Sequence, residues 1–139
     1  MSKLSEIGQI AVITGTAIGG VISSYLGGFD MILKVLLIFI VVDYITGIIC
    51  AVINKTISSS TGFKGIAKKV FILLLVGLSY MLDRVVGIDI MRNLTIMFYI
   101  ANEGISILEN ATILGVPFPE KITDVLEQIK SDSENKDKE

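Results

Sequence analysis

Long apolar runs separated by short polar connections dominate the chain. The first run, Ile7–Phe29, holds 23 residues without a charge between Glu6 and Asp30. The second run, Val35–Ile53, is the most hydrophobic of the chain and carries one charge, Asp43. A helix of about 20 residues crosses the ~30 Å hydrocarbon core of a bilayer. Both runs therefore have the length of a membrane-spanning helix.

Two later runs are shorter or less uniform. Val70–Leu82 has 13 uncharged residues and reaches the length of a span only if it extends back through Gly65 or forward to Ile88. Asn93–Leu114 is apolar but interrupted by polar residues, and Gly115 is well placed to end it. Because backbone groups in lipid must be hydrogen-bonded within their own segment, we expect these runs to be helices rather than strands.

The C-terminal part predicts one further helix. Pro119 can occupy the first helical position. Apolar residues then recur at i, i+3, i+4 and i+7, as Ile122, Val125, Leu126 and Ile129. Residues 131–139 contain no apolar side chain and are typical of a charged, disordered tail. We expect an all-α integral membrane domain over residues 1–130, with three to four transmembrane helices and a short amphipathic cytoplasmic helix at its end.

Composition narrows the class of protein. The hydrophobic fraction of 52% and mean hydropathy of +0.73 are high for a soluble domain of 139 residues with 19% charged residues. A net charge of −2 does not provide the basic surface of a nucleic-acid-binding protein. With one cysteine, Cys50, and no histidine, the sequence excludes His/Cys zinc sites and Ser-His or Cys-His nucleophiles. We expect no enzymatic activity, no metal and no cofactor.

The distribution of charge predicts an orientation in the membrane. Residues 54–69 contain four lysines and no acid, whereas seven acids fall in the last twenty residues. Under the positive-inside rule the 54–69 connection is cytoplasmic. If the fourth run also spans, the C-terminus is cytoplasmic too. Whether 7–29 spans stays open, because six glycines dilute its hydrophobicity. A cleaved signal peptide is disfavoured there, since Lys3 is offset by Glu6.

Small residues form a ladder along the first run. They occupy every fourth position, as Ala11, Gly15, Gly19, Ser23 and Gly27. Such a ladder lets helix backbones approach closely in lipid, where packing drives association. We interpret it as a surface for packing between subunits. Packing against another helix of the same chain is the alternative.

Asp43 is the polar exception in the most hydrophobic run. A charge at the bilayer centre costs at least about 2.5 kcal/mol on insertion scales and usually marks function. Asp43 could face water, pair with a basic group, be held protonated, or hydrogen-bond with Thr46 or Tyr44 at a helix contact.

The fourth run carries a polar stripe. Polar residues recur at spacings of four and three, as Thr95, Tyr99, Asn102, Ser106 and Glu109, and are flanked by Glu103 and Asn110. Three interpretations stay open for this stripe: the wall of a water-lined channel, a buried helix contact, or a helix lying flat at the membrane surface.

Several of these segments resemble the clostridial toxin-secretion and phage-lysis holin family. The resemblance covers about Leu36 to Lys130, and the first thirty residues match that family only in character. The segments that carry it are Asp43-Tyr44-Ile45-Thr46-Gly47, the basic stretch from Ser59-Ser60 to Lys68-Lys69, Asn102-Glu103-Gly104 with Leu108-Glu109-Asn110, and Gly115-Val116-Pro117.

The resemblance implies a protein that accumulates in the bacterial cytoplasmic membrane, assembles with itself and opens a lesion in the bilayer. Its cargo would be an endolysin in phages of Gram-positive bacteria, or a toxin without a signal peptide in some clostridia. A regulatory partner such as an antiholin and a selective small-ion channel are the alternatives. Many holins have two closely spaced start methionines, whereas here the next methionine after Met1 is Met31, so we expect no dual start of that kind.

Overall fold

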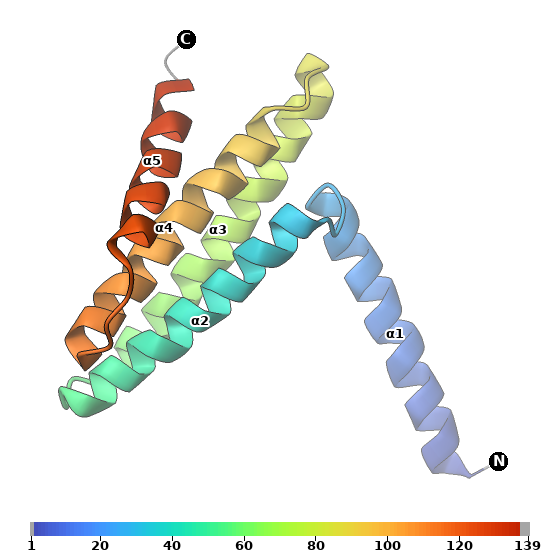
Figure 1. Cartoon of the computed structure of the whole chain (residues 1–139). Helices are drawn as coiled ribbons and strands as arrows, with labels where there is room; N and C mark the ends of the chain where they lie inside the picture. Colours follow the sequence, from blue (N-terminus) through green and yellow to red (C-terminus); the bar gives the residue numbers. More distant parts are fainter. Residues whose placement is uncertain (1, 137–139) are drawn as a thin grey trace.

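The computed structural model describes residues 2–136, and over these residues it is helical with no strand (Figure 1). Its helices are α1 Lys3–Tyr25, α2 Met31–Ile53, α3 Ser59–Val86, α4 Met91–Leu114 and α5 Glu120–Lys136. Among the described residues, α1, α2 and α3 are long and apolar enough to cross a membrane. The expected all-α membrane class is therefore confirmed.

Three of the helices form the bundle at the centre of the fold. Figure 1 shows α2, α3 and α4 side by side, with α3 antiparallel to the other two. Their facing sides make one hydrophobic core, which contains Leu33, Leu36, Ile40, Ile72, Val76, Ile96 and Ile100. Large apolar side chains also cover much of the outside, such as Ile38 on α2 and Phe71 on α3. Apolar residues on both sides of a helix are expected where lipid is the solvent.

The stretch expected to be a polar connection is mostly helix. α3 begins at Ser59, and the Ser58 side chain accepts a hydrogen bond of 3.2 Å from the backbone N–H of Thr61. A serine at this position replaces a missing helical partner, so the serine-rich segment starts the helix instead of forming a loop. The expectation of a connection over 54–69 is thus correct only for 54–58. Lys69 consequently lies on a helix within the bundle.

α1 diverges from the bundle and contacts it only near its C-terminal end (Figure 1). No residue of α1 is buried. The Tyr25 hydroxyl donates a hydrogen bond of 2.9 Å to the carbonyl of Leu74. The Tyr25 ring lies against Gly77, where a Cβ atom would come within 1.8 Å of the ring. Glycine at 77 is therefore required for this contact.

Asp83 joins the end of α3 to the start of α4. Its carboxylate accepts hydrogen bonds from the backbone N–H groups of Ile90, Met91 and Arg92, at 3.3, 2.9 and 2.9 Å. The residue before α4, Ile90, has no side chain able to cap the helix. A carboxylate brought from α3 thus satisfies the free N–H groups of the first turn of α4.

Arg92 fastens the α1–α2 turn to α4, a contact called here the Arg92 clamp. Its guanidinium donates to the carbonyls of Leu26 and Gly28, at 2.5 and 3.0 Å. It also binds both carboxylate oxygens of Asp30, at 2.8 and 3.1 Å. This pairing lowers the pKa of the Asp30 carboxyl from its ordinary value of 3.8. The clamp ties two turns that are more than sixty residues apart.

α5 folds back along α4 (Figure 1). Leu126 is buried, and its side chain lies so close to Gly104 that a Cβ there would come within 2.8 Å of it. The helix continues to Lys136, and Ser133 within it is buried. Residues 131–136 of the expected disordered tail are thus helical. Residues 137–139 of that tail lie outside the described residues.

The Arg92 clamp should control the stability of the fold. We expect Arg92→Lys to lower the free energy of unfolding by about 2–3 kcal/mol, because lysine cannot reproduce the paired and carbonyl contacts. Arg84→Lys is the matched control, since the Arg84–Asp89 pair is exposed and such pairs contribute about 0–1 kcal/mol. Denaturant unfolding of both variants in detergent measures this difference. Equal loss of stability in the two variants would contradict the assignment.

Candidate functional site

One ammonium group connects the three helices of the bundle. Lys69 on α3 donates to a carboxylate oxygen of Asp43 on α2 and to one of Glu103 on α4. The side chains of Lys69, Asp43 and Glu103 are only 14%, 10% and 6% exposed. Each carboxylate therefore binds the same cation in an environment largely closed to water.

Asn110 extends this contact along α4. Its side-chain amide donates to the second carboxylate oxygen of Asp43 at 3.2 Å and to the hydroxyl of Thr46 at 2.8 Å. The Thr46 hydroxyl in turn donates to the carbonyl of Val42 at 2.8 Å. These five residues, Asp43, Thr46, Lys69, Glu103 and Asn110, are called the Lys69 network below.

The two carboxylates of the network lie near the middle of their helices. Asp43 is the thirteenth of 23 residues in α2, and Glu103 is the thirteenth of 24 in α4. If the bundle crosses a bilayer, these charges are near the centre of the hydrocarbon, where a single charge is costly. Pairing and hydrogen bonding offset this cost, whereas removing one partner leaves a buried charge without compensation.

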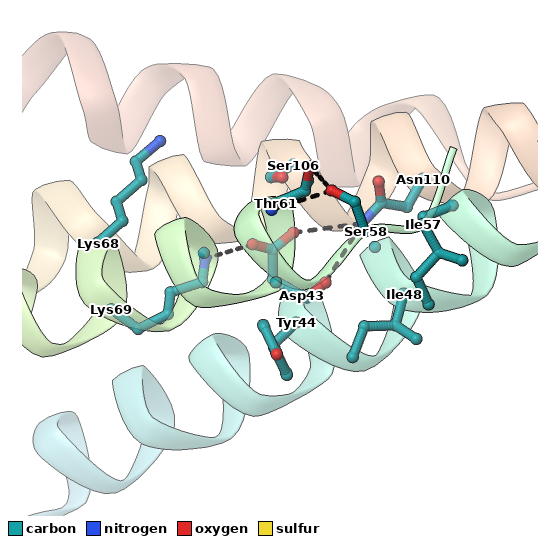
Figure 2. A pocket seen from close by; sticks show the side chains of 14 residues that line it. Asp43, Tyr44, Ile48, Ile57, Ser58, Thr61, Lys68, Lys69, Ser106 and Asn110 are labelled. Atoms are coloured by element: carbon teal, nitrogen blue, oxygen red, sulfur yellow. Dashed lines mark hydrogen bonds and ion pairs between the residues drawn. The ribbon is translucent and has the colours of Figure 1, made fainter. Parts of the chain in front are cut away.

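A cavity of about 280 Å³ leads to the network (Figure 2). Its lining extends from the α2–α3 turn, at Ile57 and Ser58, inward to Asp43 and Lys69. Glycines on α2 and α3, namely Gly47, Gly62 and Gly65, are part of this lining and leave the space that side chains would fill. Figure 2 shows Lys69 pointing toward Asp43 and Lys68 pointing away from it. The cavity connects the protein surface with the buried charges.

The structure brings some of the candidate residues together and separates others. Asp43, Thr46, Glu103 and Asn110 join the network, and Ser106 lines the cavity beside it. Tyr99, Asn102 and Glu109 do not join it. Tyr99 packs against the hydrophobic core, Asn102 is half-buried and Glu109 is exposed. Thr95 shares a hydrogen bond of 2.7 Å with Ser79 on α3.

Most of the small-residue ladder makes no contact with another helix of the chain. Ala11, Gly15 and Gly19 are exposed, and no atom lies within 4 Å of a Cβ built at either glycine. Ser23 is half-buried near the anchored end of α1. Gly27 lies beyond that end, in the turn, with a φ of 81° and the Arg92 side chain 2.7 Å from the position of a Cβ. Its glycine is required by the Arg92 clamp.

Two important residues were missed by the sequence interpretation, Lys69 and Arg92. Lys69 was assigned to a connection because of the serines and lysines before it. Ile72 and Val76 follow Lys69 by three and seven residues and are buried. This spacing places the Lys69 side chain on the buried face of α3. Arg92 similarly precedes Ile96 and Ile100 by four and eight residues.

These features define a class: a multi-pass helical membrane protein whose bundle is joined by buried charges. The family model of the bacteriophage holin family matches residues 20–131. The chain therefore belongs to the bacteriophage holin family, which confirms the resemblance found in the sequence. The Lys69 network and the Arg92 clamp fall within the matched residues, whereas most of α1 precedes them.

Three relatives illustrate this similarity. The probable holin of Bacillus phage phi105 is 36% identical over 114 residues, covering 81% of this chain and 84% of the phage protein. A Clostridium perfringens protein, described as an uncharacterized 14.9 kDa protein in the nagH 3′ region, is 43% identical over 117 residues, 83% of this chain and 89% of its own. The uncharacterized protein Lmo0128 of Listeria monocytogenes is 44% identical over 109 residues, 77% of this chain and 78% of its own. No solved structure matches the chain.

Removing the shared cation should damage the bundle. We expect Lys69→Met to lower the free energy of unfolding by about 3–5 kcal/mol, because two buried carboxylates lose their partner. Lys68→Met, the adjacent and exposed lysine, should leave stability nearly unchanged. Denaturant unfolding in detergent measures both variants.

A variant that lacks all three charges separates the contribution of charge to stability from that of packing. Replacing Asp43 and Glu103 by Leu together with Lys69→Met removes all three charges, and stability should recover. If the triple variant is as unstable as Lys69→Met alone, the loss comes from shape and not from unpaired charge.

Proposed function

We propose that the chain is a holin that assembles as a homo-oligomer in the bacterial cytoplasmic membrane and opens a lesion. The cargo would be an endolysin or a toxin without a signal peptide. The observation that carries the proposal is the family match over residues 20–131, together with the similarity to the probable holin of phage phi105. Assembly needs no ATP, metal or cofactor, because helix packing in the membrane supplies the free energy.

The free face of α1 supports self-association. No other helix lies within 4 Å of a Cβ at Gly15 or Gly19, so this part of the ladder is open to a second copy. The intramolecular alternative applies to Gly27, which lies against Arg92. The Tyr25 hydrogen bond and the Arg92 clamp fix the end of α1 on the bundle. A helix fixed at one end and open along one face can pack against a second copy through its glycines.

The charged side of α5 supports a water-filled assembly. In the docked position, Asp124, Glu127 and Asp132 are exposed while Leu126 faces α4. Charged side chains cannot face hydrocarbon without a large cost. We therefore place the α4–α5 side of the bundle toward water in the assembly and the apolar outer faces of α2 and α3 toward lipid.

The orientation that we propose puts the α2–α3 turn in the cytoplasm. Lys55, Lys64 and Lys68 lie at this end of the bundle and are exposed, in agreement with the positive-inside rule. α4 ends at this same end, and α5 then runs back along α4 toward the opposite end of the bundle (Figure 1). In this orientation the connection to α5 is cytoplasmic, whereas α5 itself does not lie in the cytoplasm, contrary to the sequence interpretation.

Expression in a bacterium with cytoplasmic reporters of graded size tests the function. We expect release of folded proteins after a delay that shortens as the amount of the chain rises. Passage of ions alone would instead identify a selective channel. Absence of any release would identify a regulatory partner such as an antiholin.

The glycine face of α1 should determine assembly. We expect Gly15→Leu with Gly19→Leu to reduce cross-linked multimers and to delay or abolish release, because leucine keeps the helix backbones apart. Ile13→Leu with Ala17→Leu is the control, since residues two positions away point about 200° around the helix. Both variants should reach the membrane in equal amounts. Unchanged assembly in the glycine variant would assign the face to another role.

Cysteine labelling tests the orientation, with Cys50 replaced by Ser. In intact cells an impermeant thiol reagent should label Asp89→Cys, in the α3–α4 turn, and not Ser59→Cys. After the lesion opens, Glu127→Cys should become labelled, while Phe71→Cys in the proposed lipid-facing surface should not. Labelling of Ser59→Cys before opening would invert the topology, and labelling of Phe71→Cys would contradict the assigned lipid side.

A further inference from the structure

We propose that the carboxylates of Asp43 and Glu103, with Lys69 between them, form a binding site for one proton that enters through the cavity at the α2–α3 turn. The site goes beyond membrane permeabilisation and does not depend on it. It follows from the charges, the burial and the access route of three residues.

The charges of the site do not balance. Two carboxylates accept from one ammonium, so the ionised group carries one net negative charge. The other partner of Asp43 is the neutral amide of Asn110. Asp43 and Glu103 are 8% and 4% exposed, and a buried charge without a partner is costly. One added proton makes the site neutral.

The geometry favours a bound proton, rather than the ammonium of a second lysine, as the charge that neutralises the site. At ordinary hydrogen-bond lengths, two oxygens bound to the same nitrogen lie within about 6 Å of each other. Two ionised carboxylates at such a separation repel each other, and the single ammonium offsets only one of the two negative charges. A proton bound there belongs to the pair and not to one residue. Lys68 lines the same cavity, but it is exposed and points away from Asp43 (Figure 2).

Lys68 is the one further charged residue among the described residues that line the cavity. On α2 the neighbouring group in the cavity is the Tyr44 hydroxyl, and on α4 it is the Ser106 hydroxyl. α5 contacts this part of α4 through Leu126, which is apolar. The ion pairs of the described residues include none made by α5.

The cavity gives the proton a route. Asp43 lines it, whereas Glu103 lies beyond Lys69 and does not. A proton that enters from water in the cavity forms an O–H bond with one carboxylate oxygen of the pair. No other bond forms or breaks. At high pH the proton leaves and the net negative charge returns, so the stability of the bundle falls as pH rises.

Infrared spectroscopy of the full chain in lipid vesicles tests the site. At a pH where the exposed carboxyls are ionised, we expect the wild type to keep one protonated carboxyl band per chain, which disappears as the pH rises further. Glu103→Gln and Asp43→Asn should each lack the band, because one carboxylate and Lys69 are already neutral together. Glu109→Gln makes the same chemical change at an exposed position of α4 and should keep the band.

Thermal unfolding of the same samples gives a second measurement. The melting temperature of the wild type and of Glu109→Gln should fall across the pH range in which the band disappears, whereas that of Glu103→Gln should stay level. Absence of the band in the wild type at every pH where the exposed carboxyls are ionised would overturn the proposal. Its persistence in both Glu103→Gln and Asp43→Asn would do the same.

A substitution in the cavity lining tests whether the proton enters through the cavity. A Cβ at Gly47 meets only the Asn110 amide, at 3.9 Å, so Gly47→Ala fits the helix while filling part of the cavity. We expect slower deuterium exchange of the carboxyl band in this variant. Exchange at the wild-type rate would contradict entry through the cavity.

Discussion

The bundle depends on one ammonium group that two acidic side chains share. Lipid gives apolar helices no hydrophobic reason to prefer each other, so polar contacts and close packing decide how they pair. Lys69 must reach both Asp43 and Glu103, which fixes how far α2 and α4 slide along α3. Asn110 lies two helical turns beyond Glu103 and again contacts Asp43, so the same relative position is specified twice.

The remaining surfaces follow from this arrangement. The Arg92 clamp and the cap formed by Asp83 close the opposite end of the bundle and hold α1 in its diverging direction. α1 is thereby left with an uncovered glycine face, and α5 covers part of α4 with its apolar side. Under the proposed function, the first surface serves assembly and the charged side of the second faces water. Among the polar residues of α4, buried Glu103 and half-buried Asn110 contact the other helices, whereas Glu109 is exposed.

The sequence predicted the parts of the fold that depend on local pattern. The runs 7–29 and 35–53 lie largely within α1 and α2, and Gly115 ends α4 with a φ of 72°. The amphipathic helix begins at Glu120, directly after Pro119. Membership in the holin family was also visible in motifs. The partner of Asp43 was not, because Lys69 lies 26 residues away on another helix and follows a serine-rich stretch that is typical of a loop. The direction of α1 and the return of α5 depend on Tyr25, Arg92 and Leu126, whose contacts no local pattern specifies.

The shared ammonium is the central claim, and solid-state nuclear magnetic resonance of the full chain in lipid bilayers tests it most directly. With labelled lysine nitrogen and labelled aspartate and glutamate carboxyl carbons, the side-chain nitrogen of Lys69 should show correlations to the carboxyl carbons of both Asp43 and Glu103. Lys68→Arg should keep these two correlations, and Lys69→Arg should remove the lysine signal that carries them. A Lys69 nitrogen that correlates with neither carboxyl carbon would contradict the account.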